Sequence, residues 1–391
     1  MDMPRNSITG RNAITRRNAI FAGAGLAVAG LGLARRPPRA GSPAALRSRL
    51  TADVRPASLT TQQQAGQRVI CSYSGLTPPD SLLTQISEGQ ASGVIFITGN
   101  ISSESQISSV IQQLVEANQQ SPVDAPLLLM TDQEGGEVNR LPGAPAMSEK
   151  EIGESSDFTT EASDAGTGAG QNLAGVGMNV DLAPVLGVYR QAGDFLDQYQ
   201  RSYSSNANQA ALCAQYFISG MQQTGVVPTA KHFPGLGAAT ASQDTDVEPV
   251  VLDIPLDTLR SVDELPYQSA IPAGVQMIMV SWATYPALDA SNPAGLSSAV
   301  VQGELRGYQG YQGVTITDAL EAGALEDFGT TQQRAVSAAG AGMDLILCAD
   351  GSASQNSDAV SGLADALQSG QLDQSGFTAS VQRITALRQS L

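Results

Sequence analysis

The chain has 391 residues but only one histidine, His232, and only two lysines, Lys150 and Lys231. A single histidine excludes the HxH and HExxH patterns that hold catalytic zinc. Three cysteines are too few for a disulfide-built scaffold, and the absence of internal repeats or heptads excludes solenoids and coiled coils. We therefore expect neither a metal ion nor a cofactor.

Positive charge is also scarce, with 21 Lys and Arg residues against 37 Asp and Glu residues and a formal net charge of −16 at pH 7. This balance disfavours nucleic acid and anionic membrane surfaces as partners, because both repel an acidic protein. It is compatible with a protein that acts on neutral or weakly charged ligands.

The N-terminal segment differs in composition from the rest of the chain. Arg16 and Arg17 precede a weakly apolar Gly/Ala/Leu run that ends at Ala34, a pattern typical of a Tat-type export signal. The run has about 15 apolar residues where a membrane span needs ~20, so an uncleaved anchor is the less favoured alternative. We predict a signal at residues 1–40, a linker at 41–60, and export to the cell wall or the extracellular space. Membrane contact is expected only through an uncleaved signal.

Eight short apolar runs recur along the remaining chain, each bounded by turn residues. They are continuous rather than alternating, which is typical of parallel strands buried on both faces. Stretches with helical apolar spacing separate several of them, at 104–118, 207–224, 265–273 and 332–341. The predicted strands lie at 69–71, 93–98, 127–131, 178–182, 226–230, 276–281, 313–317 and 344–348.

Eight strands alternating with helices over about 320 residues predict an α/β fold, a single TIM-type (β/α)8 barrel at residues 61–391. A doubly wound open sheet is the alternative, but the GxGxxG and P-loop fingerprints of such sheets are absent. In a closed barrel the first and last strands are neighbours, which would place Cys71 near Cys348. We expect buried thiols there rather than a disulfide, and one helix after the last strand.

Polar residues stand at the C-terminal ends of the predicted strands, and in a barrel these ends meet at one mouth, where active sites lie. Lys231 and His232 end the fifth run and Asp318 ends the seventh. A carboxylate held there can act as a nucleophile, a base or a metal ligand, and the shortage of other ligands disfavours a metal. The structural alternative is that Asp318 caps the next helix. Other strand ends carry Asp132, Asp181 and Ser281.

The remaining charged residues near this mouth are mixed hydrogen-bond donors and acceptors, which suits a ligand with several hydroxyl groups. A nucleophilic carboxylate in such a pocket predicts glycoside hydrolysis with retention, which needs a second group to protonate the leaving oxygen. The candidate ligand-binding residues are Asp132, Arg140, Arg201, Lys231 and His232.

Six segments carry a more specific signal: Asp132–Gly136 with Arg140, Asn179–Val185, Arg201–Tyr203, Lys231–Gly235, Val280–Ser281 with Tyr285–Leu288, and Ile316–Asp318. Together they resemble the β-N-acetylglucosaminidases of glycoside hydrolase family 3, in their single-domain bacterial form. They follow the family's order and cover almost everything after residue 65. The resemblance implies a TIM-barrel-like fold and Asp318 as the nucleophile that forms a glycosyl-enzyme. It also implies that Asp132, Arg140, Arg201, Lys231 and His232 bind a terminal N-acetylglucosamine.

The sequence departs from this family at the group that protonates the leaving oxygen. After KHFPG the family carries an Asp-x-His pair on a mobile loop, and that histidine is the acid/base. Counting from Lys231 places Ser242 and Asp244 at the two positions. Asp244 is therefore our candidate acid/base, with its pKa raised by burial or by neighbouring Asp246 and Glu248. A solvated acidic loop on a slow or inactive protein is the alternative.

We therefore predict an exported retaining β-N-acetylglucosaminidase that acts on peptidoglycan fragments or related amino-sugar glycosides. The alternatives are a catalytically weak member that binds or senses amino sugars, and a β-glucosidase or β-xylosidase. Two further departures are Glu137, where the family usually has Arg, and Gly187, where it often has Asp. They bear on substrate recognition rather than on the fold.

Overall fold

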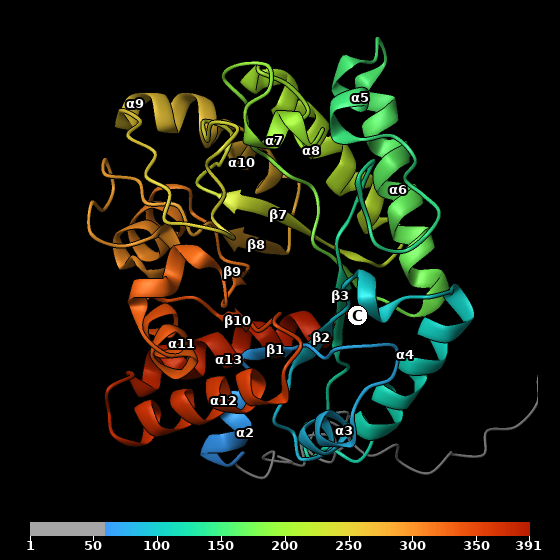
Figure 1. Ribbon diagram of the computed structural model, residues 1–391, viewed down its shortest axis with the longest axis vertical. Coiled ribbons are helices and arrows are strands. Elements are labelled where there is room, and N and C mark those ends of the chain that lie inside the picture. Colours follow the sequence, from blue (N-terminus) through green and yellow to red (C-terminus); the bar gives the residue numbers. More distant parts are fainter. Residues whose placement is uncertain (1–58) are drawn as a thin grey trace, which may run out of the picture. The chain divides into compact units, whose positions relative to one another are not determined.

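The computed structural model describes residues 59–391, so the predicted signal and nearly all of the linker lie outside the described residues. Eight parallel strands close into a barrel in the order β1-β10-β9-β8-β7-β6-β3-β2, with helices around it (Figure 1). This confirms the predicted (β/α)8 barrel. Among the described helices, none has the length and apolar character needed to cross a membrane.

All eight predicted strands are present, and most are shorter than their apolar runs. Two strands extend beyond their runs: β7 continues to Phe233, with a register shift against β8 between Ala230 and Phe233, and β9 continues to Ala319. The peptide bonds Lys231–His232 and Phe233–Pro234 are both cis. The barrel strands are β1 (Val69–Cys71), β2 (Gly93–Ile95), β3 (Leu128–Thr131), β6 (Val180–Asp181), β7 (Val227–Phe233), β8 (Met277–Val280), β9 (Val314–Ala319) and β10 (Leu345–Leu347).

The four predicted helices are confirmed, with small differences at their ends. They are α4 (Glu104–Asn118), α8 (Ala207–Gln222), α10 (Leu265–Ala270) and α11 (Thr331–Ala341). Three 3-10 helices, η1 (Thr98–Asn100), η3 (Ala294–Leu296) and η5 (Gly323–Phe328), and two π-helices, η2 (Leu259–Asp263) and η4 (Ala299–Tyr308), lie in the described connections. The other helices are α2 (Thr61–Gly66), α3 (Asp80–Ser87), α5 (Glu149–Glu154), α6 (Phe158–Val176), α7 (Phe195–Gln198), α9 (Leu256–Thr258), α12 (Ala353–Gln368) and α13 (Gln374–Arg388).

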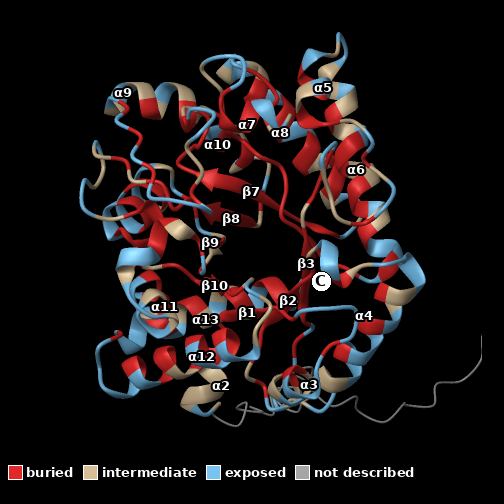
Figure 2. Cartoon of the chain, in the orientation of Figure 1, coloured by how far each residue is buried: buried red, intermediate tan, exposed pale blue. Residues whose placement is uncertain are grey.

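The barrel strands are buried on both faces, and the helices bury their inner sides (Figure 2). Side chains along a strand alternate between the barrel interior and the helix layer. Val314 and Ile316 of β9 belong to the interior core, so Asp318, two residues further on, points the same way into the barrel mouth. The same alternation brings inward Asp132, after Leu128 and Met130, and Lys231, after Val227 and Thr229.

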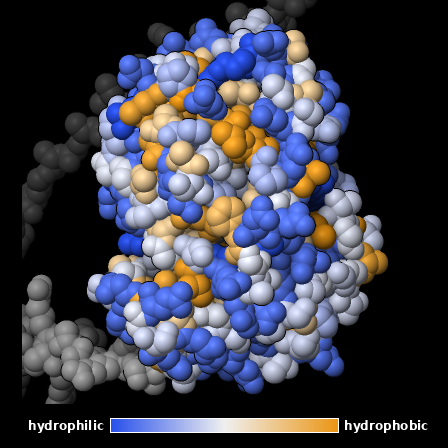
Figure 3. Space-filling view, turned by 60° about the vertical axis from the view of Figure 1, so that its left-hand side comes forward, coloured by the Kyte–Doolittle hydropathy of each residue, from blue (hydrophilic) through white to orange (hydrophobic). Residues whose placement is uncertain are grey.

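The outer surface matches the acidic, polar composition. On the face in Figure 3 hydrophilic residues predominate, and apolar residues form small separate groups. Among the described residues, the most exposed large apolar side chains are Val247, 72% exposed, and Tyr308, 54% exposed. Cys71 and Cys348 are buried thiols, as expected, and Cys213 is also a buried free thiol.

The end of the barrel opposite the mouth is closed by a helix that the sequence did not indicate. The expectation of one helix after the last strand was wrong, because α12 is followed by α13. Ile384 and Leu387 of α13 pack into the barrel interior. The buried Arg388 donates to the carbonyl oxygens of Pro126, at 2.6 Å, and Ala125, at 2.9 Å. Because Ala125 and Pro126 precede β3, α13 caps the N-terminal end of the barrel.

The longest helix within residues 59–391, α6, packs against α8 through glycines (Figure 1). A Cβ on Gly166 of α6 would lie 2.1 Å from the carbonyl oxygen of Phe217, and one on Gly220 of α8 would lie 2.3 Å from that of Ser163. Small residues therefore allow the two backbones to approach closely. Sequence reasoning missed α6 because its Gly-rich and Thr-rich composition has low helix propensity.

Two alanine substitutions in α6 should have opposite effects on stability. Gly166→Ala should destabilise the fold by about 1–3 kcal/mol, because the new methyl group overpacks against the α8 backbone. Gly175→Ala, where nothing lies within 4 Å of the added Cβ, should stabilise it by about 0.5–1 kcal/mol. Urea unfolding of both variants measures the difference. Equal effects would mean that α6 and α8 are not packed through glycines.

Candidate active site

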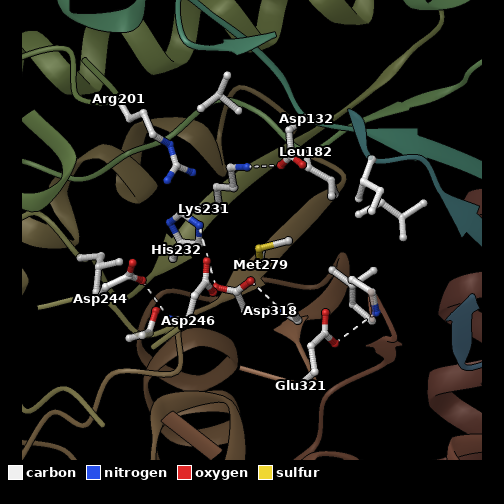
Figure 4. A pocket seen from close by; sticks show the side chains of 18 of the residues that line it. Asp132, Leu182, Arg201, Lys231, His232, Asp244, Asp246, Met279, Asp318 and Glu321 are labelled. Carbon is white, nitrogen blue, oxygen red and sulfur yellow. Dashed lines mark hydrogen bonds and ion pairs between the residues drawn. The ribbon is translucent and has the colours of Figure 1, made fainter. Parts of the chain in front are cut away.

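A cavity of about 280 Å³ lies at the C-terminal ends of the strands (Figure 4). The structure brings all seven predicted site residues to its wall, although they come from widely separated segments. Apolar side chains complete the wall, among them Leu182, Phe195, Leu236 and Met279. The predicted site residues are Asp132, Arg140, Arg201, Lys231, His232, Asp244 and Asp318.

An ion-pair network forms one side of this cavity. The Lys231 Nζ lies 2.6 Å from Asp132 Oδ1 and 2.7 Å from Glu134 Oε1. The Arg201 guanidinium donates two hydrogen bonds to the Glu134 carboxylate, both at 2.8 Å. Burial alone would raise the pKa of Glu134, but the charges of Arg201 and Lys231 lower it to about 2. Glu134 is therefore ionised and holds both cations in place.

Glu134 was not predicted as a site residue, although it lies in the Asp132–Gly136 motif. It belongs to a hairpin formed by β4 (Gln133–Gly135) and β5 (Val138–Asn139) just after β3. The signal that could have found it is the two-residue spacing from Asp132, which puts both carboxylates on one side of the chain. A second signal was the pair of cations expected at the mouth, Lys231 and Arg201. Two buried positive charges need more than one carboxylate to balance them, so Asp132 alone could not suffice.

Two further buried carboxyl groups support this hairpin and the strand beside it. Asp181 accepts a hydrogen bond from the Gln133 amide at 2.9 Å, and Glu149 accepts one from the Val185 amide at 2.7 Å. Burial, followed by the charge of Glu134, raises the pKa of Glu149 well above its usual value. Burial likewise raises the pKa of Asp181. Both groups act as fixed hydrogen-bond partners of the backbone beneath the cavity.

Asp318 lies across the cavity from this network, at the end of β9. Its Oδ1 accepts a hydrogen bond from the Ala319 amide at 2.8 Å, while its side chain is still 17% exposed. Burial, and then the charge of Asp246, raises the pKa of Asp318 to about 7, against the opposing effects of the Ala319 amide and Lys231. A fixed, reachable carboxylate with one oxygen held by an amide suits a nucleophile.

The only histidine lies between Asp318 and the cations. His232 Nε2 is 4.0 Å from Asp318 Oδ2, and its Nδ1 is buried without a hydrogen-bond partner among the described residues. Burial and the charges of Lys231 and Arg201 lower the pKa of His232 well below its usual value. The imidazole is therefore neutral, which suits a ligand-contacting group better than an acid.

The acidic loop after β7, which contains Asp244 and Asp246, forms another part of the cavity wall. Asp244 Oδ1 accepts a hydrogen bond from the backbone amide of Asp246 at 2.9 Å, so this carboxylate is engaged by its own loop. Asp246 also lines the cavity, and in Figure 4 its side chain points toward Asp318 and His232. Asp246 was noted in the sequence only as a neighbour of Asp244. Counting residues from Lys231 could not reveal the path of the loop.

The remaining wall is formed by Arg140 and Glu321. Arg140 donates a hydrogen bond to Thr98 at 3.3 Å, and Glu321 accepts one from the Ala349 amide at 3.2 Å. Neither of the two further sequence departures reaches the cavity. Glu137 is exposed on the hairpin turn, and a side chain at Gly187 would meet Leu196 at 2.2 Å. Within residues 59–391 there is no cluster of His, Cys, Asp and Glu suited to a metal ion.

Comparisons with known proteins agree with this fold and site. The family profile described as "Glycosyl hydrolase family 3 N terminal domain" matches residues 63–387. The chain therefore belongs to glycoside hydrolase family 3 and is a glycoside hydrolase.

Three relatives illustrate the similarity. An "Uncharacterized secreted glycosyl hydrolase" of Arthroderma benhamiae is 44% identical over 330 residues, 84% of this chain and 93% of that protein. A family 3 β-N-acetylglucosaminidase structure from Paenibacillus sp. has a TM-score of 0.80 and 31% identity, covering 85% of this chain. The match spans only 63% of the Paenibacillus chain. A β-N-acetylhexosaminidase structure from Beutenbergia cavernae has a TM-score of 0.78 and 27% identity, covering 85% of this chain and 99% of that one.

Replacing the bridging carboxylate should lower stability in a pH-dependent way. Glu134→Gln leaves Lys231 and Arg201 with too little negative charge beside them. We expect the free energy of unfolding at pH 7 to fall by about 3–5 kcal/mol. Because the folded-state pKa of Glu134 is lowered to about 2, its contribution is complete above its ordinary pKa and disappears as the pH falls toward 2. The difference in the free energy of unfolding between the variant and the parent should therefore shrink below about pH 4.

The matched control is Glu137→Gln, which removes an exposed carboxylate from the same hairpin. It should change the free energy of unfolding by less than about 0.5 kcal/mol. Chemical denaturation at several pH values measures both variants, and a Glu134→Gln loss that does not vary with pH would contradict the ion-pair assignment.

Proposed function

We propose that this protein is a retaining β-N-acetylglucosaminidase that removes a terminal N-acetylglucosamine from amino-sugar glycosides such as peptidoglycan fragments. The observation that carries this proposal is Asp318, a carboxylate at the end of β9 that faces an ion-paired, hydrogen-bonding wall across a small cavity. The printed names of the relatives, a β-N-acetylglucosaminidase and a β-N-acetylhexosaminidase, support the choice of sugar.

In the first step, Asp318 Oδ2 attacks the anomeric carbon and the bond to the leaving oxygen breaks. The leaving oxygen takes a proton from an acid on the loop that carries Asp244 and Asp246. In the second step the same group, now a carboxylate, removes a proton from water. The oxygen of that water forms a bond to the anomeric carbon as the ester bond to Asp318 breaks. Two inversions give net retention.

The wall opposite Asp318 would hold the sugar ring. Asp132, Lys231, Arg201 and Arg140 offer charged hydrogen-bond partners to hydroxyl groups, and the neutral His232 adds an uncharged one. The partners of Lys231 and Arg201 fix their positions before the ligand arrives, which reduces the entropy lost on binding. A cavity of about 280 Å³ is small for a ligand site and suits one terminal sugar rather than an internal stretch of a polysaccharide.

We also propose that the protein acts outside the cytoplasm. The twin arginine and apolar run of residues 1–40 support export through a Tat-type signal. The relative from Arthroderma benhamiae, which carries the word "secreted" in its name, points to the same location.

Removing the nucleophile should abolish hydrolysis. Asp318→Asn keeps the shape and the Ala319 hydrogen bond but has no negative charge to attack with, so kcat should fall by several orders of magnitude. Hydrolysis of aryl glycosides of N-acetylglucosamine, glucose and xylose measures both the loss and the sugar preference. A fluorinated N-acetylglucosaminyl donor should label Asp318 in the parent enzyme. Activity of the variant within about tenfold of the parent would rule out this nucleophile.

The two lysines of the chain form a matched pair for testing the sugar-binding wall. Lys231→Met removes a buried charge-assisted contact worth roughly 1.5–3 kcal/mol, so kcat/KM should fall about 10- to 150-fold. Lys150→Met removes a partly exposed partner of Asp197 outside the cavity and should leave kcat/KM within about twofold. Equal kinetics for the two variants, both checked for folding, would mean that the sugar does not contact Lys231.

A further inference from the structure

We infer that Asp246, rather than Asp244, is the acid/base of this reaction, and that its loop is held in place by the segment that follows the nucleophile. This inference rests on the proposed retaining mechanism. It moves the acid/base role two residues along the chain from the position found by counting from Lys231.

The two aspartates differ in what their carboxylates contact. Asp244 Oδ1 is engaged by the Asp246 amide at 2.9 Å, in a short loop of the Asx-turn kind. The Asp246 carboxylate makes no hydrogen bond or ion pair with other described residues, and it points into the cavity toward Asp318 (Figure 4). It is therefore free to meet a glycosidic oxygen, while the Asp244 carboxylate fixes the backbone from which Asp246 projects.

The loop that carries Asp244 and Asp246 is hydrogen-bonded to the segment that follows the nucleophile. The amide of Gly323 donates to the Asp246 carbonyl oxygen at 2.9 Å, and the amide of Ala324 donates to that of Thr245 at 3.0 Å. Gly323 and Ala324 open η5 (Gly323–Phe328), the 3-10 helix shortly after Asp318. A Cβ on Gly323 would lie 2.1 Å from the carbonyl oxygen of Val247, so only glycine allows this approach. The nucleophile and the acid are thus fixed to one another through the backbone.

Contacts on the other side of the loop complete its support. The amide of Phe195 donates to the Ala239 carbonyl oxygen at 2.9 Å, and Gln198 Nε2 donates to that of Ala241 at 2.8 Å. Thr245, between the two aspartates, is only 4% exposed. Because both flanks are anchored, the position of the Asp246 backbone at the cavity is set by the fold.

The charges around this carboxyl favour holding a proton. Although Asp246 is open to the solvent-filled mouth, the surrounding protein and the charge of Asp244 raise its pKa, opposed by Arg201 and Lys231 across the cavity. Asp246 is in turn the neighbouring charge with the largest effect on Asp318. Two carboxyl groups this close share one proton over a range where isolated aspartates would both be ionised. The Ala319 amide stabilises the charged form of Asp318, as suits a nucleophile, whereas no described hydrogen-bond donor stabilises the charged form of Asp246.

The decisive experiment is Asp246→Ala, assayed on two substrates and with sodium azide. On an N-acetylglucosaminyl disaccharide, kcat/KM should fall about 10²- to 10⁴-fold, because the leaving sugar must be protonated. On a dinitrophenyl N-acetylglucosaminide, formation of the glycosyl-enzyme should stay within about tenfold, because that leaving group needs no proton. Azide should then attack the Asp318 ester, displace the carboxylate and release β-glycosyl azide.

Asp244→Asn is the matched variant. It keeps an oxygen that accepts the hydrogen bond from the Asp246 amide and removes the negative charge. Its kcat/KM on the disaccharide should therefore fall less than about tenfold, and no glycosyl azide should form. The inference is overturned if Asp246→Ala hydrolyses the disaccharide like the parent, or if glycosyl azide forms with Asp244→Ala and not with Asp246→Ala. In either case labelling of Asp318 by the fluorinated donor would leave the proposed function standing. Without that label, the proposed function itself fails.

Gly323→Ala tests the docking of the loop. The added methyl group should push Val247 and Asp246 away, so the disaccharide should lose far more rate than the dinitrophenyl substrate. Equal losses on both substrates for Gly323→Ala, in a folded protein, would contradict a positioning role.

Discussion

The site depends on the contact of one buried carboxylate, Glu134, with two cations. In a chain of net charge −16, Lys231 and Arg201 are brought to the barrel mouth and fixed there by the same group. These three residues come from the hairpin after β3, from β7 and from the segment after α7, so the network ties three connections of the barrel together. An unpaired buried charge would be very unfavourable, and each partner therefore requires the others.

Much of this arrangement could be predicted because strands have a strict two-residue period. Continuous apolar runs revealed all eight strands, and a polar residue two places beyond an inward-facing one had to enter the mouth, as Asp132 and Asp318 do. Family resemblance supplied the roles assigned to these residues. The barrel and the set of residues at its mouth were therefore accessible from the sequence.

Other features were not accessible, and each for a physical reason. Helix α6 is stabilised by close packing through Gly166, which local propensity counts as unfavourable. The cap α13 buries only a few apolar side chains among many polar ones, so its pattern is weak. The position of Asp246 follows from backbone hydrogen bonds between its loop and the start of η5. The only side-chain requirement of this contact is that residue 323 has no Cβ, and the sequence pattern does not reveal it.

The cap α13 has a consequence for the order of events during biosynthesis. Its Arg388 holds the backbone before β3, and its Arg383 pairs at 2.7 Å with Asp344, just before β10. The interior core is complete only when Ile384 and Leu387 enter it. Because α13 follows every strand along the chain, the barrel cannot close around its final core until that helix has left the ribosome. Until then the N-terminal end of the barrel lacks its cap, so the nascent chain exposes apolar strand residues that favour aggregation.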